Sequence, residues 1–197
     1  ATRGTRVKRL FDILLGRAAR PVPPRVEGLI AISTAAITME AQLGFVPRAI
    51  AGLVFKPMES VYFERAQEEL DGVLQIAVKE TNSTYRIWTD SYRYRWVILE
   101  DPDFEDLVTT IQGASQILTE HGFGEQLLAA VFRFDDRQGQ PFYWIYQFKL
   151  GKFTPFAPRE GRRRDETQEL RLVALLEREL PVERRPELWY ALWDIPV

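Results

Sequence analysis

The stretch LLAAVFRFDDRQGQPFYWIYQFK, residues 127–149, decides the fold class of this chain. Two apolar, β-prone runs, 127–134 and 142–149, flank a polar loop that contains Gly139, and this pattern predicts a β-hairpin. Because successive side chains of a strand point to opposite faces, the second run places a wholly aromatic set on one face. That set comprises Phe142, Trp144, Tyr146 and Phe148. We expect this strand to lie centrally in a sheet, with its aromatic face against helices.

A second hairpin is predicted upstream. Apolar and polar residues alternate over 37–45, which is typical of a half-buried strand. The apolar run 49–55 follows after Val46-Pro47-Arg48, so the two runs form a hairpin in this interpretation. A helix over 34–43 is the alternative.

The rest of the pattern repeats a hairpin followed by a helix. The runs 85–89 and 94–99 form a further hairpin. Helices are expected to begin near Glu59, at Asp101, which precedes a Pro as an N-cap residue does, and near Asp165. The expected buried stripe of the first of these helices comprises Phe63, Ala66, Leu70, Val73 and Ala77. These elements predict an α+β fold, an antiparallel sheet of successive β-hairpins with helices packed mainly on one face.

Length and composition limit the chemistry. With 197 residues, of which 46% are hydrophobic, the chain can bury one core, and we expect a single α+β domain over 26–197. The absence of Cys excludes disulfides, thiolate catalysis and Cys-based zinc sites. The single histidine, His121, argues against His-containing triads and multi-His metal sites. We therefore expect no catalytic residues, no metal and no cofactor. No stretch approaches the roughly 20 continuous apolar residues that cross a bilayer.

The first 25 residues carry a separate signal. They contain seven Lys and Arg residues against Asp12 alone, a net charge of +6, so the remaining residues of this chain of net charge −2 carry −8. An amphipathic helix is predicted over residues 5–16, followed by a Pro-rich linker. Such a helix suits an anionic membrane surface or a protein partner, and the alternative is a terminal helix that packs on its own domain or frays. The candidate contact residues are Arg6, Lys8, Arg9, Leu10, Phe11 and Leu14.

A second candidate surface lies near the start of the last predicted helix. Three consecutive arginines, Arg162, Arg163 and Arg164, precede Asp165, and guanidinium groups at a helix N-terminus suit an anion or an acidic partner. The preceding turn, with Phe153 and Phe156, is expected to contribute to this patch. The alternative, which we favour, is that nearby acids neutralise the arginines locally; these acids are Asp165, Glu166 and Glu169.

Other polar residues receive structural interpretations. His121 beside a glycine is typical of a helix C-terminus, and Asp135-Asp136 of a hairpin turn. The aromatic and arginine residues interleaved over 85–96 resemble a surface for stacking nucleic-acid bases. Cross-strand aromatic pairs explain them better, because the rest of the chain is acidic and has no nucleic-acid-binding signature. We expect no nucleic-acid partner.

Several motifs, spread in order over nearly the whole chain, resemble the PspA-associated protein PspAB family. They are LFDILLGR at 10–17, AAITMEA at 35–41, FKP at 55–57, GFGEQLL at 122–128, FTPFAP at 153–158 with RRD at 163–165, and the tryptophans Trp189 and Trp193. The resemblance implies a role beside PspA in a phage-shock-like envelope-stress system, with PspA or an HtpX-like membrane metalloprotease as partner. It implies no catalytic residue, and by analogy it suggests a fold like that of YbjN and secretion chaperones.

These observations together predict a non-enzymatic accessory or adaptor protein. It would be cytoplasmic and peripheral at the inner face of the membrane, with the basic helix on anionic lipid or a partner and the α+β body presenting a second surface. The alternative is a soluble chaperone-like module that binds a partner segment on its sheet. An enzyme with an unrecognised carboxylate site is a third, more distant interpretation.

Overall fold

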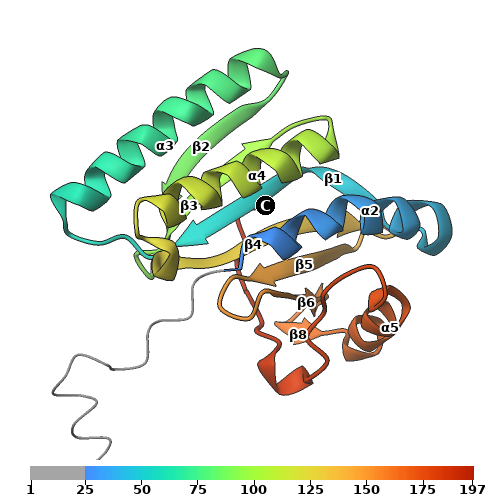
Figure 1. Cartoon of the computed structure of the whole chain (residues 1–197). Coiled ribbons are helices and arrows are strands. Elements are labelled where there is room, and N and C mark those ends of the chain that lie inside the picture. Colours follow the sequence, from blue (N-terminus) through green and yellow to red (C-terminus); the bar gives the residue numbers. More distant parts are fainter. Residues whose placement is uncertain (1–24) are drawn as a thin grey trace, which may run out of the picture.

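A six-stranded antiparallel sheet organises residues 25–197, which are the residues that the computed structural model describes (Figure 1). The strand order is β2-β3-β1-β4-β5-β6, so the two longest strands lie at its centre. A small hairpin, β7 with β8, follows the sheet. The strands are β1 Val46–Phe55, β2 Thr84–Thr89, β3 Arg95–Glu100, β4 Leu127–Asp135, β5 Pro141–Gln147, β6 Lys152–Phe156, β7 Pro158–Arg159 and β8 Arg163–Arg164.

Helices α2, α3 and α4 cover one face of this sheet, and α5 packs beside β6 (Figure 1). The α+β class and the antiparallel sheet expected from the sequence are thereby confirmed. The long helices are α2 Ala31–Thr38, α3 Val61–Glu80, α4 Phe104–Glu120 and α5 Glu166–Leu176. The short helical turns are η1 Glu27–Ile30, η2 Met39–Leu43, η3 Gly124–Gln126 and η4 Pro186–Leu188.

The expected hairpin of 37–45 with 49–55 is wrong, and the alternative helix is correct. Residues 27–43 are helical throughout, and β1 is one ten-residue strand that pairs with both β3 and β4. Burial follows the helical period, because Ile32, Ala35, Ala36 and Met39 are buried. Ile37, which the strand pattern placed with Met39, is 69% exposed. The alternation over 37–45 fitted both periods, and packing against the sheet selected the helix.

The two later hairpins are confirmed as β2–β3 and β4–β5. The aromatic set on β5 lies in the same core as residues of α2, α4 and α5, as predicted, but β5 is next to the edge strand β6 rather than central. Helix α4 begins two residues later than predicted, because Asp103 and not Asp101 accepts the free N–H groups of Glu105 and Asp106. In α3 the buried stripe continues through Leu74, while Val73 is exposed.

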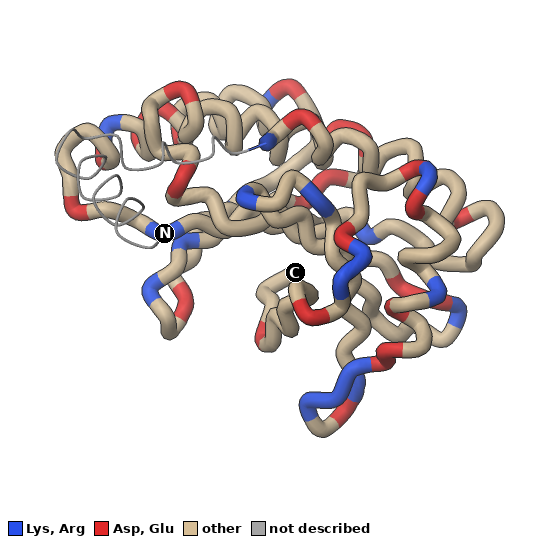
Figure 2. The backbone as a smooth tube through the Cα atoms, turned by 60° about the horizontal axis from the view of Figure 1, so that its bottom comes forward, with Lys and Arg blue, Asp and Glu red and all other residues tan. Residues whose placement is uncertain are grey.

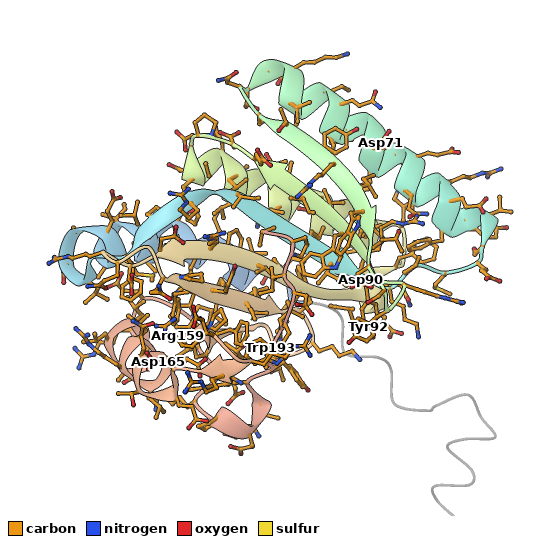
Figure 3. The ribbon with its side chains drawn as sticks, turned by 180° about the vertical axis from the view of Figure 1, so that it is seen from behind. Asp71, Asp90, Tyr92, Arg159, Asp165 and Trp193 are labelled. Atoms are coloured by element: carbon orange, nitrogen blue, oxygen red, sulfur yellow. The ribbon has the colours of Figure 1, made fainter. Side chains whose placement is uncertain are left out.

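The two faces of the sheet are covered differently. The helix-side core contains large aromatic residues of β5 together with α2, α3, α4 and α5. The opposite face, which is formed by residues such as Val54, Trp96 and Ile145, is covered by the segment 192–197. In that segment Trp193 packs its ring against Phe156, with the ring centroids 5.1 Å apart. Figure 3 shows Trp193 in front of the sheet on this face.

Candidate docking surfaces

The predicted arginine patch lies on the β7–β8 hairpin, which projects from the body with consecutive basic positions (Figure 2). Its turn is formed by Gly161 and Arg162, which both adopt positive φ, 71° and 54°. Asp165 ends the hairpin and is the N-cap of α5, where its carboxylate accepts the N–H of Gln168 at 3.0 Å. The helix start near Asp165 is therefore confirmed.

The three arginines of this patch have different environments. Arg164 is engaged inside the body: it donates to Glu169 at 3.0 Å, to the Trp189 carbonyl at 2.9 Å and to the Pro155 carbonyl at 3.2 Å. Arg162 forms an exposed ion pair with Asp194 at 2.8 Å. Arg163 is exposed and donates to the Glu160 carbonyl of its own turn.

The expectation that Phe153 and Phe156 present a surface is wrong. Both rings are buried, and they point to opposite faces of the sheet, since Phe153 lies in the helix-side core and Phe156 in the opposite core. Residues 153 and 156 are three positions apart in β6, so their side chains point to opposite faces of the sheet. Each face is covered at that position, so neither ring meets solvent. Only Arg162 and Arg163 of the expected patch are available to a partner.

Neutralisation by the expected acids holds for Arg164 alone of the three arginines, because Asp165 pairs with Arg159 instead. Arg159 pairs with Asp165 at 3.2 Å (Figure 3). Arg164 pairs with Glu169 at 3.0 Å. Glu169 is buried and also accepts the Ala157 N–H at 2.8 Å, so it ties α5 to the end of β6. Burial raises the pKa of the Glu169 carboxyl, against the lowering effect of the Ala157 N–H and the Arg164 guanidinium.

A second buried acid, Glu183, holds a further segment against β6. Its carboxylate accepts hydrogen bonds from Arg185 at 3.0 Å and from Lys152 at 3.4 Å. The hydrogen bonds from Arg185 are the main reason that the pKa of Glu183 is lowered to about 2. Beside it, the N–H of Phe153 donates to the Pro181 carbonyl at 2.8 Å, and the Phe153 carbonyl accepts the Glu183 N–H at 2.9 Å.

The β2–β3 hairpin ends in a tightly bonded turn. The Asp90 carboxylate accepts the N–H groups of Tyr92 and Tyr94, both at 2.9 Å, and the indole N–H of Trp96 at 3.1 Å. Arg93 adopts φ 67°, the left-handed conformation that a three-residue hairpin loop places before the return strand. Figure 3 shows Asp90 and Tyr92 together at this turn, on the other side of the molecule from Arg159 and Asp165.

The aromatic residues of this hairpin are only partly explained by pairing within the sheet. Trp88 lies directly opposite Trp96, and the Tyr85 hydroxyl donates to Asp71 of α3, so the interpretation as sheet pairs holds for these residues. Tyr92, however, is 79% exposed, and Trp88 is 44% exposed. The turn therefore presents aromatic side chains to solvent on a rigid support.

The described chain begins at the same end of the sheet. The Arg25 carbonyl accepts the Tyr146 hydroxyl at 2.6 Å, and the Arg25 N–H donates to the Phe148 carbonyl at 3.3 Å. Burial raises the pKa of Tyr146 to about 12, so this phenol stays protonated as a donor. Gly28 lets the chain approach, because a Cβ there would lie 2.9 Å from the Tyr146 hydroxyl oxygen.

The predicted contact residues of the basic N-terminal segment lie outside the described residues; they are Arg6, Lys8, Arg9, Leu10, Phe11 and Leu14. Within residues 25–197 no group of three or more His, Cys, Asp and Glu side chains is arranged to hold a metal ion. Over the same residues, no helix has the length and apolar character that crossing a bilayer requires. His121 caps the C-terminus of α4, as predicted, and bonds to Glu69 of α3 at 2.8 Å.

The sequence interpretation missed Glu183 and the anchoring of Arg25. Residues 181–187, PVERRPE, have the composition of a solvated loop, and nothing in that pattern singles out one of the acids. Tyr146 was recognised as a core residue, but its hydroxyl partner lies 121 residues away in the sequence. Such partners follow from the strand order, which the sequence did not predict.

The comparisons with known proteins bear on the whole chain. A family model described as PspAB, PspA associated protein B, matches residues 8–197. No curated protein and no solved structure matches the sequence or the fold. The family match spans every described element and reaches into the basic N-terminal segment. This chain belongs to the PspA associated protein B family.

Proposed function

We propose that this chain is a non-enzymatic accessory or adaptor protein of a PspA-linked envelope-stress system. It binds a protein partner through its body and contacts the anionic inner face of the membrane through its basic N-terminal segment. Membership of the PspA associated protein B family supports the link to PspA. PspA and an HtpX-like membrane metalloprotease are the candidate partners, and the site of action is the cytoplasmic side of the membrane.

The distribution of charge is the observation that supports an adaptor best. Residues 1–24 carry a net charge of +5, and Arg25, at their base, is fixed to Tyr146 of the body. In the body, the two acids described above, Glu169 and Glu183, are buried and tied to arginines and backbone N–H groups. Their contacts are structural, whereas the unpaired charge lies on the surface, where a membrane or a partner meets it.

Vesicle flotation of the full chain tests the membrane contact. We expect the chain to float with phosphatidylglycerol-rich vesicles but not with phosphatidylcholine vesicles, and to lose binding as salt rises. The triple variant Arg6→Gln, Lys8→Gln and Arg9→Gln should bind more weakly by about fivefold for each cation removed. A chain that stays unbound on both kinds of vesicle contradicts the membrane part of the proposal.

Titration with purified PspA tests the partner. We expect a complex that survives size-exclusion chromatography, and we expect it to form without vesicles. If PspA and an HtpX-like protease both leave the chain unbound, the adaptor proposal is wrong.

A chaperone-like module is a second candidate, because one edge of the sheet is open. The exposed strand β2 has no neighbour on its outer side among the described residues. An extended partner segment can add to such an edge through main-chain hydrogen bonds. Amide exchange of Ile87 in the presence of PspA decides between the candidates: slowed exchange favours strand addition, and unchanged exchange excludes it at this edge.

A further inference from the structure

One end of the sheet gathers several exposed elements. Arg25 is bonded to Phe148, which follows β5, and Phe148 in turn bonds to Leu128 at the start of β4. At the same end, Leu127 of β4 pairs with Phe55 of β1, and Phe55 pairs with Arg95 of β3. The β2–β3 turn, the β1–α3 connection, the β5–β6 turn and the base of the N-terminal segment therefore lie side by side.

Exposed cations line this end. Lys56 follows β1, Arg93 lies in the β2–β3 turn, and Lys149 lies in the β5–β6 turn. Across residues 25–197, none of these three side chains takes part in an ion pair. Among the acids at this end, Asp90 is occupied by the turn, and Glu59, Glu64, Glu120 and Glu125 are exposed. Nearest the β2–β3 turn, the Arg93 side chain is exposed, whereas the carboxylate of Asp90 is held by hydrogen bonds within the turn.

Exposed aromatic and apolar side chains lie between these cations. Trp88 and Tyr92 project from the hairpin, and Met58, 44% exposed, lies in the β1–α3 connection. Trp and Tyr are enriched where protein meets the headgroup region of a bilayer, because an apolar ring and a polar atom suit that layer. We call Lys56, Met58, Trp88, Tyr92, Arg93 and Lys149 the strand-end surface.

The opposite end of the sheet carries a cluster of exposed acids at the start of α4. There Glu100 ends β3, and the exposed acids Asp103, Glu105 and Asp106 follow at the start of α4. Of the cations at that end, Arg48 is paired with Asp135 at 3.4 Å. An anionic surface repels this cluster of acids, which favours an orientation with the start of α4 turned away from the surface.

We propose that the strand-end surface docks on an anionic phospholipid membrane. Trp88 and Tyr92 lie at the level of the headgroups, and Lys56, Arg93 and Lys149 face lipid phosphates. This inference rests on the membrane contact proposed above for the N-terminal segment and adds a second contact, on the folded body. Four strand spacings, about 19 Å, separate β5, where Arg25 is bonded, from β2, so Trp88 lies well apart from Arg25.

Site-specific labelling of the full chain tests this inference. The chain has no Cys, so Tyr92→Cys carries a single environment-sensitive dye such as NBD. We expect a blue shift of the dye emission on phosphatidylglycerol-rich vesicles, with quenching by nitroxide-labelled lipid, and no change on phosphatidylcholine vesicles. The matched control is Gln138→Cys in the β4–β5 turn, at the acidic end, which should report no change.

Charge variants test the same contact without a dye. The triple variant Lys56→Gln, Arg93→Gln and Lys149→Gln should bind vesicles more weakly, by about fivefold for each cation removed. The matched control removes three exposed cations elsewhere, Lys79→Gln, Arg137→Gln and Arg178→Gln, and should bind as the unaltered chain does. Circular dichroism of both variants checks that the body remains folded.

The outcomes separate this inference from the function on which it rests. If the chain floats but the Tyr92 dye and the triple variant report no contact, the N-terminal segment binds alone and the inference is overturned. If the dye responds to PspA and not to vesicles, the surface binds protein, and the inference is likewise overturned. If nothing floats, both proposals are wrong. A lipid-dependent response at Tyr92 together with weakened binding of the triple variant supports the inference.

Discussion

The two edges of the sheet are finished in opposite ways. At β6 the chain returns and bonds to Phe153 through Pro181 and Glu183, and Val182 forms a parallel bridge with Phe153. At β2 the described chain places nothing beside the strand, and five of its six residues are exposed. An edge that is buried must satisfy its backbone groups within the protein, whereas an exposed edge leaves them to water or to a partner.

The register of the hairpin shows which β2 groups are open. The Asp90 N–H donates to the Tyr94 carbonyl, so Asp90 and Tyr94 form a hydrogen-bonded pair. Bonded and non-bonded pairs alternate in an antiparallel ladder, so Trp88 is bonded to Trp96, and the backbone groups of Ile87 point outward. Along β2, residues with outward-pointing backbone groups therefore alternate with residues bonded to β3, and point substitutions can test this alternation.

The largest expected loss of stability follows from removing the Glu169 side chain, which joins α5 to the end of β6 at the closed edge. The variant Glu169→Ala leaves the Ala157 N–H and the Arg164 guanidinium without a carboxylate partner in a buried site. We expect the free energy of unfolding to fall by about 3 kcal/mol, measured by urea denaturation. Glu166→Ala, on the exposed side of the same helix, is the matched control and should change it by less than about 0.5 kcal/mol. Equal effects would show that Glu169 does not fasten α5 to β6.

Proline substitutions should distinguish the two sides of β2. Trp88→Pro removes a donor of the β2–β3 ladder and should cost about 3 kcal/mol of unfolding free energy. Ile87→Pro removes an outward N–H and should cost less than about 1 kcal/mol, since edge strands tolerate Pro there. Amide exchange of the unaltered chain gives an independent check, with Ile87 exchanging faster than Trp88 and Phe153. Equal protection of Ile87 and Trp88 would contradict the open edge.

Acid should loosen the closed edge through Glu183. Its pKa is lowered from 4.5 to about 2 in the folded protein, chiefly by Arg185, so its carboxylate stabilises the fold fully above pH 4.5. That contribution is lost as the pH falls toward about 2. The variant Glu183→Gln should therefore differ from the unaltered chain above pH 4.5, and the difference should shrink as the pH is lowered. The effect is smaller than that of Glu169→Ala, because the Arg185 side chain is 60% exposed.

The pKa of Glu169 is shifted in the opposite direction to the pKa of Glu183. Its folded-state pKa is raised, so the folded protein binds more protons than the unfolded chain just above pH 4.5, and stability falls as the pH rises there. Glu169→Gln keeps an acceptor for the Ala157 N–H and removes this titration. A difference between the two glutamine variants that does not change with pH would contradict both assignments.

The sequence predicted correctly the elements whose apolar residues follow a single periodicity, that of a strand or that of a helix. It failed where the same residues fit both periodicities. The runs 127–134 and 142–149 allowed only a hairpin, whereas 37–45 fitted a strand and a helix, and only burial against the sheet decided. The environments of the three arginines, Arg162, Arg163 and Arg164, were predicted only in part. Local acids do neutralise Arg164, but its burial depends on the Trp189 carbonyl, which is brought there by tertiary structure.

Surface exposure was the least predictable property. The interpretation of Tyr85 and Trp88 as sheet pairs was correct, yet a pairing pattern does not say whether a strand lies at the centre or the edge. Because the order β2-β3-β1-β4-β5-β6 puts β2 outermost, Trp88 and Tyr92 meet solvent. Phe153 and Phe156 lie on the opposite edge strand and are buried, because the segment 181–183 and the segment 192–197 cover them. The sequence interpretation thus expected exposed aromatic rings at β6, where the rings are buried, and did not expect the exposed rings at β2.

The smallest predicted effect concerns the turn that supports the open edge. Arg93 adopts φ 67°, a conformation that costs a residue with a side chain about 1–2 kcal/mol. Arg93→Gly should raise the free energy of unfolding by about 0.5 kcal/mol, since glycine relieves that strain but loses more chain entropy on folding. Tyr92→Gly, one residue earlier and without positive φ, is the control and should lower stability.

If Arg93→Gly stabilises the fold, the strained backbone of Arg93 in the turn at the open edge needs a functional reason. Strain at an exposed turn persists when the side chain is needed for another purpose. The proposed membrane contact supplies such a purpose, because the same variant that stabilises the fold removes one cation from the strand-end surface. We expect Arg93→Gly to be more stable in urea and to bind phosphatidylglycerol-rich vesicles about fivefold more weakly. A variant that is more stable and binds vesicles equally well would leave the strained arginine without this explanation.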